Sequence, residues 1–360
     1  PVRSPPTDMT TPSSVLVTVG AGFVGSHAAA YFNDRGARVT ALDNLSRVSS
    51  LRTADETRDT AGYNWDYLES HHPEVERVNG DVRDRDLLFD LVEGHDAVVH
   101  TAGQVAVTAS LDDPRHDFEV NAGGTFNVLD AAAAASSDPA VAFASTNKVY
   151  GGNVNAIPVR ESDTRYWYDD PAYDDGVPES LSIDHTEHTP YGVSKLAGDL
   201  YVQDYAARNE VSAAAFRMSC IYGPRQFGNE DQGWVAHFIL SAKRGEPLTI
   251  FGDGKQVRDV LYVDDLIRAY DAFLSDPNGK PAVYNMGGGP ENTTSLIELL
   301  DHLDSEYGYA TSVEYDDWRE GDQRVYVSDI GRAREELDWR PEVDFETGIR
   351  RFVEWLTGVE

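Results

Sequence analysis

The sequence predicts an α/β protein built on a doubly wound parallel sheet, and three observations support this prediction. Short apolar segments rich in β-branched residues alternate with longer segments of mixed polarity, as strands and helices do in such folds. A glycine-rich turn follows the first apolar segment, and an acidic residue ends the second. The chain has 360 residues, which is enough for a large core of this kind.

The expected elements follow one another in a regular order at first and less regularly later. Six strands with helices between them are expected at 15–19, 38–42, 75–78, 97–100, 140–144 and 211–216. After about residue 217, we expect short strands near 248–251 and 282–286, and helices near 233–244, 263–275, 294–307 and 346–357. This later part is expected to form a smaller C-terminal lobe, with substrate held in the cleft between the lobes.

The glycine-rich turn indicates the ligand of the first part. The strand Val15-Leu-Val-Thr-Val19 leads into Gly20-Ala-Gly22-Phe23-Val24-Gly25 and then into a helical segment. In a Rossmann fold these glycines let the backbone turn tightly and approach a pyrophosphate at the helix N-terminus. The next strand ends in Asp43, where a carboxylate accepts hydrogen bonds from an adenosine ribose and repels a 2′-phosphate. NAD is therefore favoured over NADP, with a simple turn at Asp43-Asn44 as the alternative.

These features divide the chain into three expected parts. Residues 1–14, rich in Pro, Ser and Thr, are expected to be a flexible tail. Residues 15–216 are the expected NAD-binding Rossmann domain, interrupted by a long polar insert at 152–188. Residues 217–360 are the expected smaller α/β substrate lobe. This division leaves open that part of the chain crosses between the Rossmann domain and this lobe. Because the insert begins just after Thr146 and ends just before Tyr191, we expect it to cover the substrate.

A candidate acid/base pair lies in Tyr191-Gly-Val-Ser-Lys195. Residues four apart share one helix face, so the lysine ammonium favours the phenolate of a tyrosine whose ordinary pKa is near 10. A tyrosine held in this way can act as a general base on a sugar hydroxyl. The polar residues Ser145 and Thr146 follow a buried strand at the sheet edge where such folds bind ligands, so either can hydrogen-bond the same hydroxyl.

Composition excludes several classes of partner. The formal net charge is −32, with 62 acidic against 30 basic residues, which argues against binding to nucleic acid or to an anionic membrane. Few of the cations are lysines, and this balance is typical of proteins from halophilic organisms, whose molar cytoplasmic salt screens the repulsion. We expect a halophilic origin, with an ordinary very soluble acidic enzyme as the alternative.

Other residues and patterns in the sequence argue against a disulfide, a membrane span and a metal site. The single cysteine, Cys220, excludes an intramolecular disulfide and fits a reducing cytoplasm. No apolar run approaches the length of a membrane span, and no signal-peptide pattern opens the sequence, so a soluble cytoplasmic protein is expected. His71-His72, His185 and His188 form no metal-ligand pattern, and no metal is expected.

Taken together, the motifs resemble those of the extended short-chain dehydrogenase/reductase family, also called the NAD-dependent epimerase/dehydratase family. The resemblance covers residues 15–357 and rests on the glycine turn, the Tyr-Lys pair and the segments Asp43-Asn-Leu-Ser, Gly80-Asp-Val-Arg83, His100-Thr-Ala-Gly-Gln104 and Asn121-Ala-Gly-Gly-Thr125. The longer segments resemble the CDP-paratose 2-epimerases (CDP-tyvelose epimerases) most closely. They are Ala102-Gly-Gln-Val-Ala106, Ser145-Thr-Asn-Lys-Val-Tyr-Gly151, Tyr222-Gly-Pro-Arg-Gln-Phe227, Asp231-Gln-Gly-Trp-Val235, Gly254-Lys-Gln-Val-Arg-Asp-Val-Leu261 and Asp322-Gln-Arg-Val325.

The resemblance implies an NAD-dependent nucleotide-sugar epimerase that inverts C2 of a CDP-hexose through a transient 2-keto sugar. It also implies NAD that is tightly bound and recycled in each turnover, and a homodimer formed through helices at 112–134 and 190–208. The implied catalytic residues are Thr146, Tyr191 and Lys195. The implied cofactor-binding residues are Gly20, Gly22, Phe23, Val24, Gly25, Asp43, Asn44, Asp81, Val82, Ala102, Gln104, Asn121, Tyr191 and Lys195. The implied substrate-binding residues are Gln104, Thr146, Asn147, Arg225, Gln226, Lys255, Arg258 and Arg324.

Three other functions stay open from the residues. A UDP-glucose/UDP-galactose 4-epimerase needs the same Tyr, Lys and Thr with the sugar shifted in the cleft. A nucleotide-sugar 4,6-dehydratase typically needs Asp-Glu after the Thr, where this chain has Asn147 and Lys148. A non-catalytic NAD-binding regulator is supported only by Val19, which stands where related sequences have glycine and is strained if the backbone there needs a positive φ.

Overall fold

The computed structural model describes residues 11–46 and 60–359, so most of the flexible tail expected at 1–14 lies outside the described residues. Its centre is a parallel sheet of seven strands, which confirms the predicted doubly wound α/β fold. In spatial order the strands are β12 (Val283–Met286), β8 (Ala213–Met218), β5 (Ala140–Thr146), β4 (Ala97–His100), β1 (Ser14–Thr18), β2 (Arg38–Asp43) and β3 (Glu76–Asn79). The strand order reverses between β1 and β4, where folds of this type open a ligand crevice.

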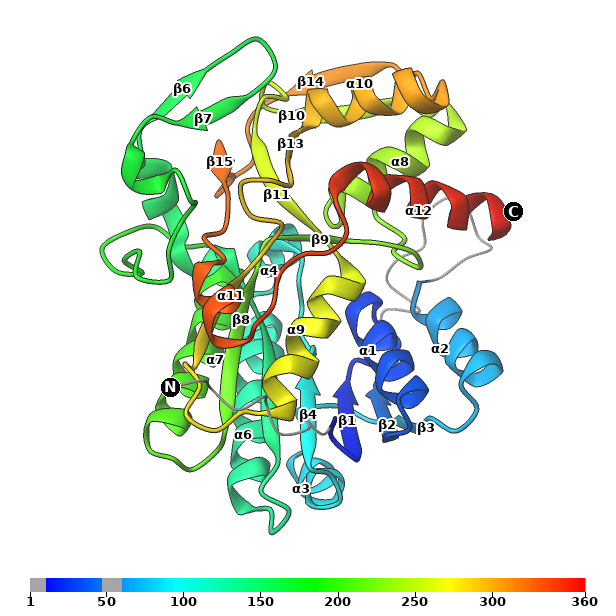
Figure 1. The fold of residues 1–360 in the computed structure, drawn as a ribbon, viewed down its shortest axis with the longest axis vertical. Coiled ribbons are helices and arrows are strands. Elements are labelled where there is room, and N and C mark those ends of the chain that lie inside the picture. The colour runs from blue at the N-terminus through cyan, green and yellow to red at the C-terminus, as the bar shows by residue number, and fades with distance from the viewer. Residues whose placement is uncertain (1–10, 47–59, 360) are drawn as a thin grey trace, which may run out of the picture.

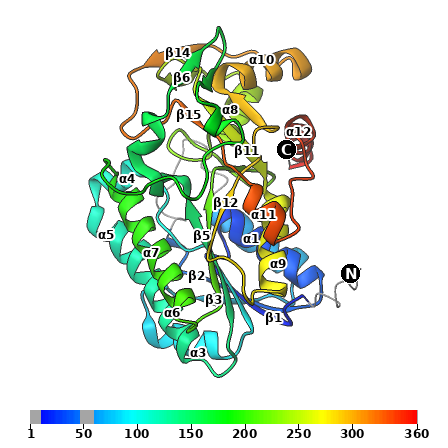
Figure 2. The same ribbon diagram turned by 60° about the vertical axis from the view of Figure 1, so that its left-hand side comes forward.

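The central strands are apolar because both faces of the sheet are covered. Val15 and Val17 pack into one core cluster, and Leu16 between them packs into another on the opposite face. One face carries α1 (Phe23–Asp34), α9 (Val263–Ser275) and α11 (Gly331–Glu336), and the other carries α3 (Arg85–Glu93), α6 (Gly124–Ala134) and α7 (Pro190–Ala207) (Figures 1 and 2). Helix α2 (Thr60–His71) packs beside α1.

Besides α11, two further segments beyond residue 217 belong to this sheet layer. Strand β12, expected in the C-terminal lobe, pairs with β8 in parallel, from Val283 beside Ala215 to Met286 beside Met218. Helix α9 packs against α1 and β5 through buried side chains that include Leu266 and Phe273. Pairing between strands so far apart in the chain is not visible in local periodicity, which explains the difference.

The C-terminal lobe lies above the carboxyl ends of the strands in Figure 1. Its remaining elements are β9 (Cys220–Tyr222), α8 (Trp234–Arg244), β10 (Leu248–Phe251), β11 (Val257–Tyr262), β13 (Thr293–Ser295), α10 (Leu296–Tyr307), β14 (Val313–Asp316), β15 (Val325–Tyr326) and α12 (Phe345–Val359). Strand β11 pairs with β9, β13 and β15, and β10 pairs with β14. Apolar side chains of α8, α10 and α12 form a separate core beneath these strands.

The insert at 152–188 packs on the C-terminal lobe. It contains the end of a 3-10 helix (η3, Asn147–Ala156), a hairpin of β6 (Val159–Glu161) and β7 (Tyr166–Tyr168), and a short 3-10 turn (η4, Pro171–Tyr173). Tyr166 packs with Val257 and Val325, and Arg165 forms an ion pair with Glu298 of α10 at 2.5 Å. These contacts draw the hairpin onto β11, β15 and α10 (Figure 1).

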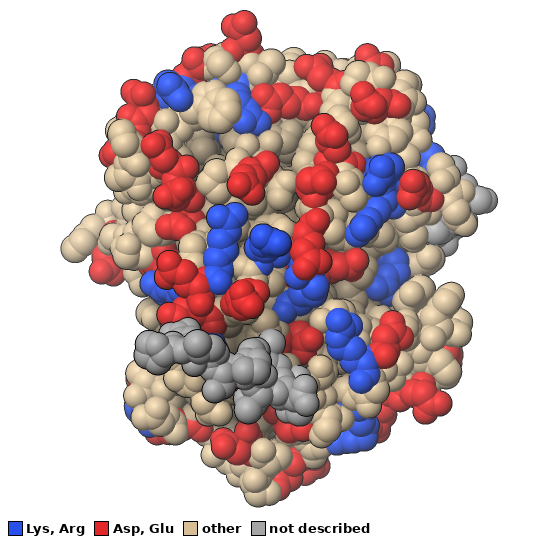
Figure 3. Space-filling model, viewed as in Figure 1, with Lys and Arg blue, Asp and Glu red and all other residues tan. Residues whose placement is uncertain are grey.

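The charged side chains on the surface reflect the acidic composition of the chain. Acidic side chains lie over every part of the face seen in Figure 3, with arginine and lysine side chains interspersed across its middle. Several basic groups on this chain are paired with acids, as Arg268 is with Asp265 and Glu342. Among the described residues no helix is both long and apolar enough to cross a membrane.

Candidate functional site

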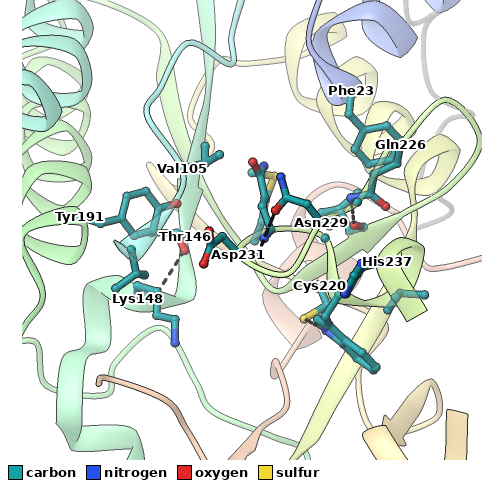
Figure 4. A pocket seen from close by; sticks show the side chains of 18 of the residues that line it. Phe23, Val105, Thr146, Lys148, Tyr191, Cys220, Gln226, Asn229, Asp231 and His237 are labelled. Atoms are coloured by element: carbon teal, nitrogen blue, oxygen red, sulfur yellow. Dashed lines mark hydrogen bonds between the residues drawn. The ribbon is translucent and has the colours of Figure 1, made fainter. Parts of the chain in front are cut away.

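A cavity of about 560 Å³ opens at the carboxyl edge of the sheet, between the sheet and the C-terminal lobe. The loops after β1, β4, β5 and β8 form one side, and α8, β10, β11 and residues 319–322 form the other. Figure 4 shows Tyr191, Thr146 and Lys148 together on one side of the cavity and Phe23, Gln226 and His237 on another. Elements from both ends of the sequence therefore meet at one site.

The glycine turn forms the floor of this cavity. Val19 adopts a φ of 54°, so the backbone does need the positive φ that strains a β-branched residue. A Cβ built on Gly22 would lie 2.7 Å from Cγ1 of Val19, and one on Gly25 would overlap the carbonyl oxygen of Val19. Because only glycine fits at these positions, the backbone is left bare and can approach a pyrophosphate closely. Gly22, Phe23, Val24 and Gly25 all line the cavity, and this cradle fits a dinucleotide.

The acidic end of β2 lies beside the same turn. Oδ2 of Asp43 accepts a hydrogen bond from the backbone N–H of Ala21 at 2.9 Å, and Oδ1 accepts one from Leu45 at 2.8 Å. The buried carboxylate of Asp43 therefore braces the glycine turn and also starts the local turn that was the alternative, whereas its contact with an adenosine ribose stays a prediction.

The neighbouring residues implied in cofactor binding form a second small network. Asn44 donates to Oδ2 of Asp81 at 2.7 Å, and the hydrogen bond from Arg83 holds the pKa of Asp81 well below its usual range. Val82 is buried beside this pair. Asp43, Asn44, Asp81 and Val82 border the glycine turn without lining the cavity itself.

The loop after β4 is fixed by side chains beneath it. The backbone N–H of Ala102 donates to Oγ1 of Thr18 at 3.0 Å. Asn121 accepts from the backbone N–H of Gln104 at 2.9 Å and donates to its carbonyl at 3.0 Å. Nε2 of Gln104 donates a hydrogen bond to the carbonyl oxygen of Ala106 at 2.7 Å. These residues therefore shape the cavity wall formed by Thr101, Gly103 and Val105.

Helix α7 brings the acid/base pair to the cavity. Thr189 caps the helix by accepting from the N–H of Gly192 at 3.2 Å, and Pro190 occupies its first turn. Tyr191 and Lys195 are both buried and both line the cavity. The Lys195 ammonium stands 4.2 Å from the centre of the Phe143 ring. Burial lowers the pKa of Lys195 to about 7, although the carboxylates of Asp199 and Asp117 oppose that shift.

The end of β5 supplies the polar residues beside Tyr191. Ser145 donates its hydroxyl proton to Asp199 at 2.6 Å, away from the cavity. Thr146 caps the following 3-10 helix by accepting from the N–H of Lys148 at 3.3 Å. Asn147 donates to Gln323 at 3.3 Å. Of the two hydroxyls considered from the sequence, the geometry favours Thr146 as the one available to a ligand.

The residues implied in substrate binding separate into two groups. Gln226 and Arg258 line the cavity, and Arg258 forms an ion pair with Asp322 at 2.6 Å on the cavity wall. The Arg225 guanidinium instead lies 4.0 Å from the centre of the Tyr67 ring, in a buried position.

Lys255 and Arg324 also lie away from the cavity lining. Lys255 forms an ion pair with Glu161 at 2.6 Å. Arg324 is exposed, with its guanidinium 5.8 Å from the centre of the Tyr166 ring. The insert likewise contributes no lining residue from 152–188, so the cover expected over the substrate is not formed by it. Tyr166 and Tyr168 of the insert pack on the lobe instead.

Several lining residues were not identified from the sequence. Arg319 lies 3.8 Å above the Phe251 ring and forms ion pairs with Glu230 at 3.4 Å and Asp231 at 3.5 Å. Lys148 donates to the carbonyl of Gly321 at 3.0 Å, which closes the cavity from the side opposite the glycines. The segment Asp231-Gln-Gly-Trp-Val235 was a usable signal for part of this wall, whereas no motif marks Arg319.

Across residues 11–46 and 60–359, no group of three or more His, Cys, Asp or Glu side chains is arranged to hold a metal ion. Half-buried Cys220 lines the cavity, and its Sγ accepts a hydrogen bond from Nε1 of Trp234 at 3.1 Å.

Comparisons with known proteins bear on the family of this chain. Residues 15–287 match the model of the NAD dependent epimerase/dehydratase family. The chain is 37% identical to CDP-paratose 2-epimerase of Salmonella typhi, over 96% of this chain and 99% of that protein. It is 33% identical to a putative UDP-glucose 4-epimerase of Methanocaldococcus jannaschii, over 95% and 98% of the two chains.

A solved structure gives the same result for the fold. UDP-glucose 4-epimerase of Thermotoga maritima with UDP-glucose superimposes with a TM-score of 0.76 at 28% identity, covering 96% of this chain and 99% of that one. The glycine cradle, the Tyr-Lys pair and these similarities lead to one conclusion: the chain belongs to the NAD-dependent epimerase/dehydratase family.

Proposed function

We propose that this protein is a nucleotide-sugar epimerase that inverts C2 of a CDP-hexose of the CDP-paratose/CDP-tyvelose type, using tightly bound and recycled NAD. The observation that carries the proposal is the meeting of Tyr191, Lys195 and Thr146 with the glycine cradle and Arg258 around one cavity. Similarity to a CDP-paratose 2-epimerase over the length of both chains supports the choice of substrate.

The residues of this cavity suit proton transfer at a sugar hydroxyl. Gly20, Gly22 and Gly25 would hold NAD, which would supply a reversible hydride acceptor beside the sugar carbon. Tyr191 takes the hydroxyl proton as the carbon is oxidised to a ketone and gives a proton back as the ketone is reduced. Lys195 stabilises the phenolate of Tyr191 when protonated, and Thr146 orients the reacting hydroxyl.

The opposite wall suits a nucleotide diphosphate. Arg258 presents a guanidinium whose charge is partly balanced by Asp322, and guanidinium groups bind phosphate oxygens bidentately. Gln226 and Arg319 add polar groups to the same wall. A firm hold on the diphosphate leaves the hexose free to turn, so that the ketone can present its other face before it is reduced.

A 4-epimerase acting on UDP-glucose or UDP-galactose is the second candidate, because relatives with that name match nearly the whole chain. A 4,6-dehydratase is disfavoured, since the positions after Thr146 hold Asn147 and Lys148 and not a carboxylate pair. The proposed assembly is a homodimer through α5 (Pro114–Phe118), α6 and α7. These helices expose large apolar side chains in Phe118, Phe126, Val193, Leu200 and Tyr201.

The test is proton NMR of the purified protein with CDP-paratose, CDP-glucose, UDP-glucose and UDP-galactose in separate tubes, with no added cofactor. Molar potassium chloride is used because a net charge of −32 repels itself at low salt. Coupling constants report which carbon inverts. Inversion at C2 of a CDP-sugar is the expected result, and inversion at C4 of a UDP-sugar alone would establish the second candidate in its place.

A further inference from the structure

A buried carboxylate lies beneath the Tyr-Lys pair. Asp117 belongs to the short helix α5 (Pro114–Phe118) and is fully buried. Its Oδ2 accepts a hydrogen bond from the hydroxyl of Ser194, which lies between Tyr191 and Lys195 on α7. Its Oδ1 accepts from Nδ2 of Asn121 at 3.1 Å and from Nε2 of Gln104 at 3.2 Å. Side chains from α7, from residues 119–123 and from the loop after β4 therefore converge on this one carboxylate.

The hydrogen-bond donors of Asp117 are all neutral. Asp199, the other buried carboxylate near Lys195, differs in this respect, because Arg217 holds it through two bonds at 2.8 Å and 3.0 Å. When all hydrogen-bond donors of a buried carboxylate are neutral, most of its negative charge stays uncompensated. The nearby cation is Lys195, whose charge lowers the pKa of Asp117 against the rise caused by burial.

Besides Asp117, the carboxylate of Asp199 also raises the pKa of Lys195, and it does so more strongly. His100 on β4 is bonded to Thr18 at 2.9 Å and Thr125 at 3.0 Å, and burial lowers its pKa to about 3, so it is neutral. Tyr191 and Asp199 share α7 with Lys195. A Cβ built on Gly103 would lie 3.6 Å from Nζ of Lys195 and 3.0 Å from Oδ1 of Asn121, so Lys195 and the Asp117 network border the same glycine.

We propose that Asp117 is a positioning residue that keeps Lys195 protonated and fixes α7 through Ser194. The inference rests on the proposed role of Lys195 in holding the phenolate of Tyr191. Asp117 lines no part of the cavity and touches the reaction only through Lys195 and Ser194. Its loss therefore lowers the fraction of protonated Lys195 and leaves the diphosphate wall at Arg258 intact.

The test is an NMR pH titration of the NAD-loaded protein labelled with [ε-¹³C]lysine. The chain has five lysines, Lys148, Lys195, Lys243, Lys255 and Lys280, so the Lys195 signal is assigned as the one lost in Lys195→Arg. In Asp117→Asn, the titration midpoint of Lys195 is expected to fall by about one pH unit or more. At pH values above this lowered midpoint, kcat is then expected to fall about tenfold, while KM changes little.

Matched variants separate charge from structure. Asp113→Asn removes the same charge from an exposed site of α5, and asparagine still caps the helix, so Lys195 should titrate as in the wild type. The double variant Asp117→Ser/Ser194→Asp moves the carboxylate to α7 and should restore the midpoint, even if Asp117→Asn does not fold. An unchanged Lys195 midpoint in Asp117→Asn, or a low one in the double variant, would overturn the proposal. Because the titration needs no turnover, its result is independent of which sugar the enzyme inverts.

Discussion

The carbonyl oxygen of Val19 occupies the space that a Cβ of Gly25 would need. Val19 turns its backbone into the left-handed region, with a φ of 54°, and its carbonyl then faces the first turn of α1. The same carbonyl accepts a hydrogen bond from the N–H of Gly22 at 3.0 Å. One strained residue thus sets the position of the backbone that receives the cofactor.

Gly25→Ala is expected to lose bound NAD. The added methyl group must push the Val19 backbone away, and overpacking of this kind costs about 1–3 kcal/mol, or roughly tenfold in Kd at about 1.4 kcal/mol. Cofactor released from the denatured protein, measured by chromatography, gives the occupancy. Gly94→Ala is the matched control, because its nearest neighbour would be at 3.8 Å. Equal NAD content in the two variants would contradict the assigned cradle.

Activity is expected to depend on pH through Lys195. Its ammonium form favours the Tyr191 phenolate, and the pKa of Lys195 is about 7. The value of kcat/KM should therefore fall as the pH rises through about 7, since deprotonated lysine no longer stabilises the phenolate. The effect on stability has the opposite direction. The unfolded chain holds this proton up to its ordinary pKa near 10.4, so the free energy of unfolding gains from this group as the pH rises above about 7. A kcat/KM that rises steadily to pH 9 would contradict the role of charged Lys195.

Arg258 and Arg324, which are both implied in substrate binding, should behave differently. Arg258→Met removes a guanidinium from the cavity wall and leaves Asp322 without its partner, so Kd for CDP or UDP should rise at least about tenfold. Arg324→Met changes an exposed side chain away from the cavity lining and should have a much smaller effect. Calorimetric titration of both variants with both nucleotides tests this difference, and equal losses would place the diphosphate nearer Arg324.

The proposed homodimer should depend on the exposed apolar face of α7. Leu200 is 45% exposed, and Leu200→Glu places a charge in the middle of that face, so the variant is expected to be monomeric. Tyr315→Glu changes a residue that is 61% exposed on β14 and should leave the assembly unchanged. Light scattering in molar potassium chloride measures the masses. A dimeric Leu200→Glu protein would move the interface elsewhere.

The local features of the fold were predictable from the sequence. The strand before Gly20, the turn and α1 follow from residue types within about a dozen positions. The place of β12 was not, because it depends on pairing between residues 215 and 283, far apart in the chain. The packing of the insert was also missed, since Tyr166 meets Val257 and Val325 only after the lobe has folded.

The candidate site shows the same division. Tyr191 and Lys195 were recognisable because their spacing on one helix carries the chemistry. Arg225 was expected among the substrate contacts, but its backbone has a φ of 64° and its side chain packs against Tyr67. Arg319 had no motif, and its place over Phe251 depends on how residues 319–322 return to the cavity.

The measurement that tests the central claim most directly uses CDP-paratose carrying deuterium at C2. The account predicts that the product keeps the deuterium at C2 with the opposite configuration, because hydride leaves that carbon and returns to it within one cavity. Proton and deuterium NMR in ordinary water, with no added NAD, give both position and configuration. Loss of the label to solvent, or inversion at C4 with C2 untouched, would contradict the account.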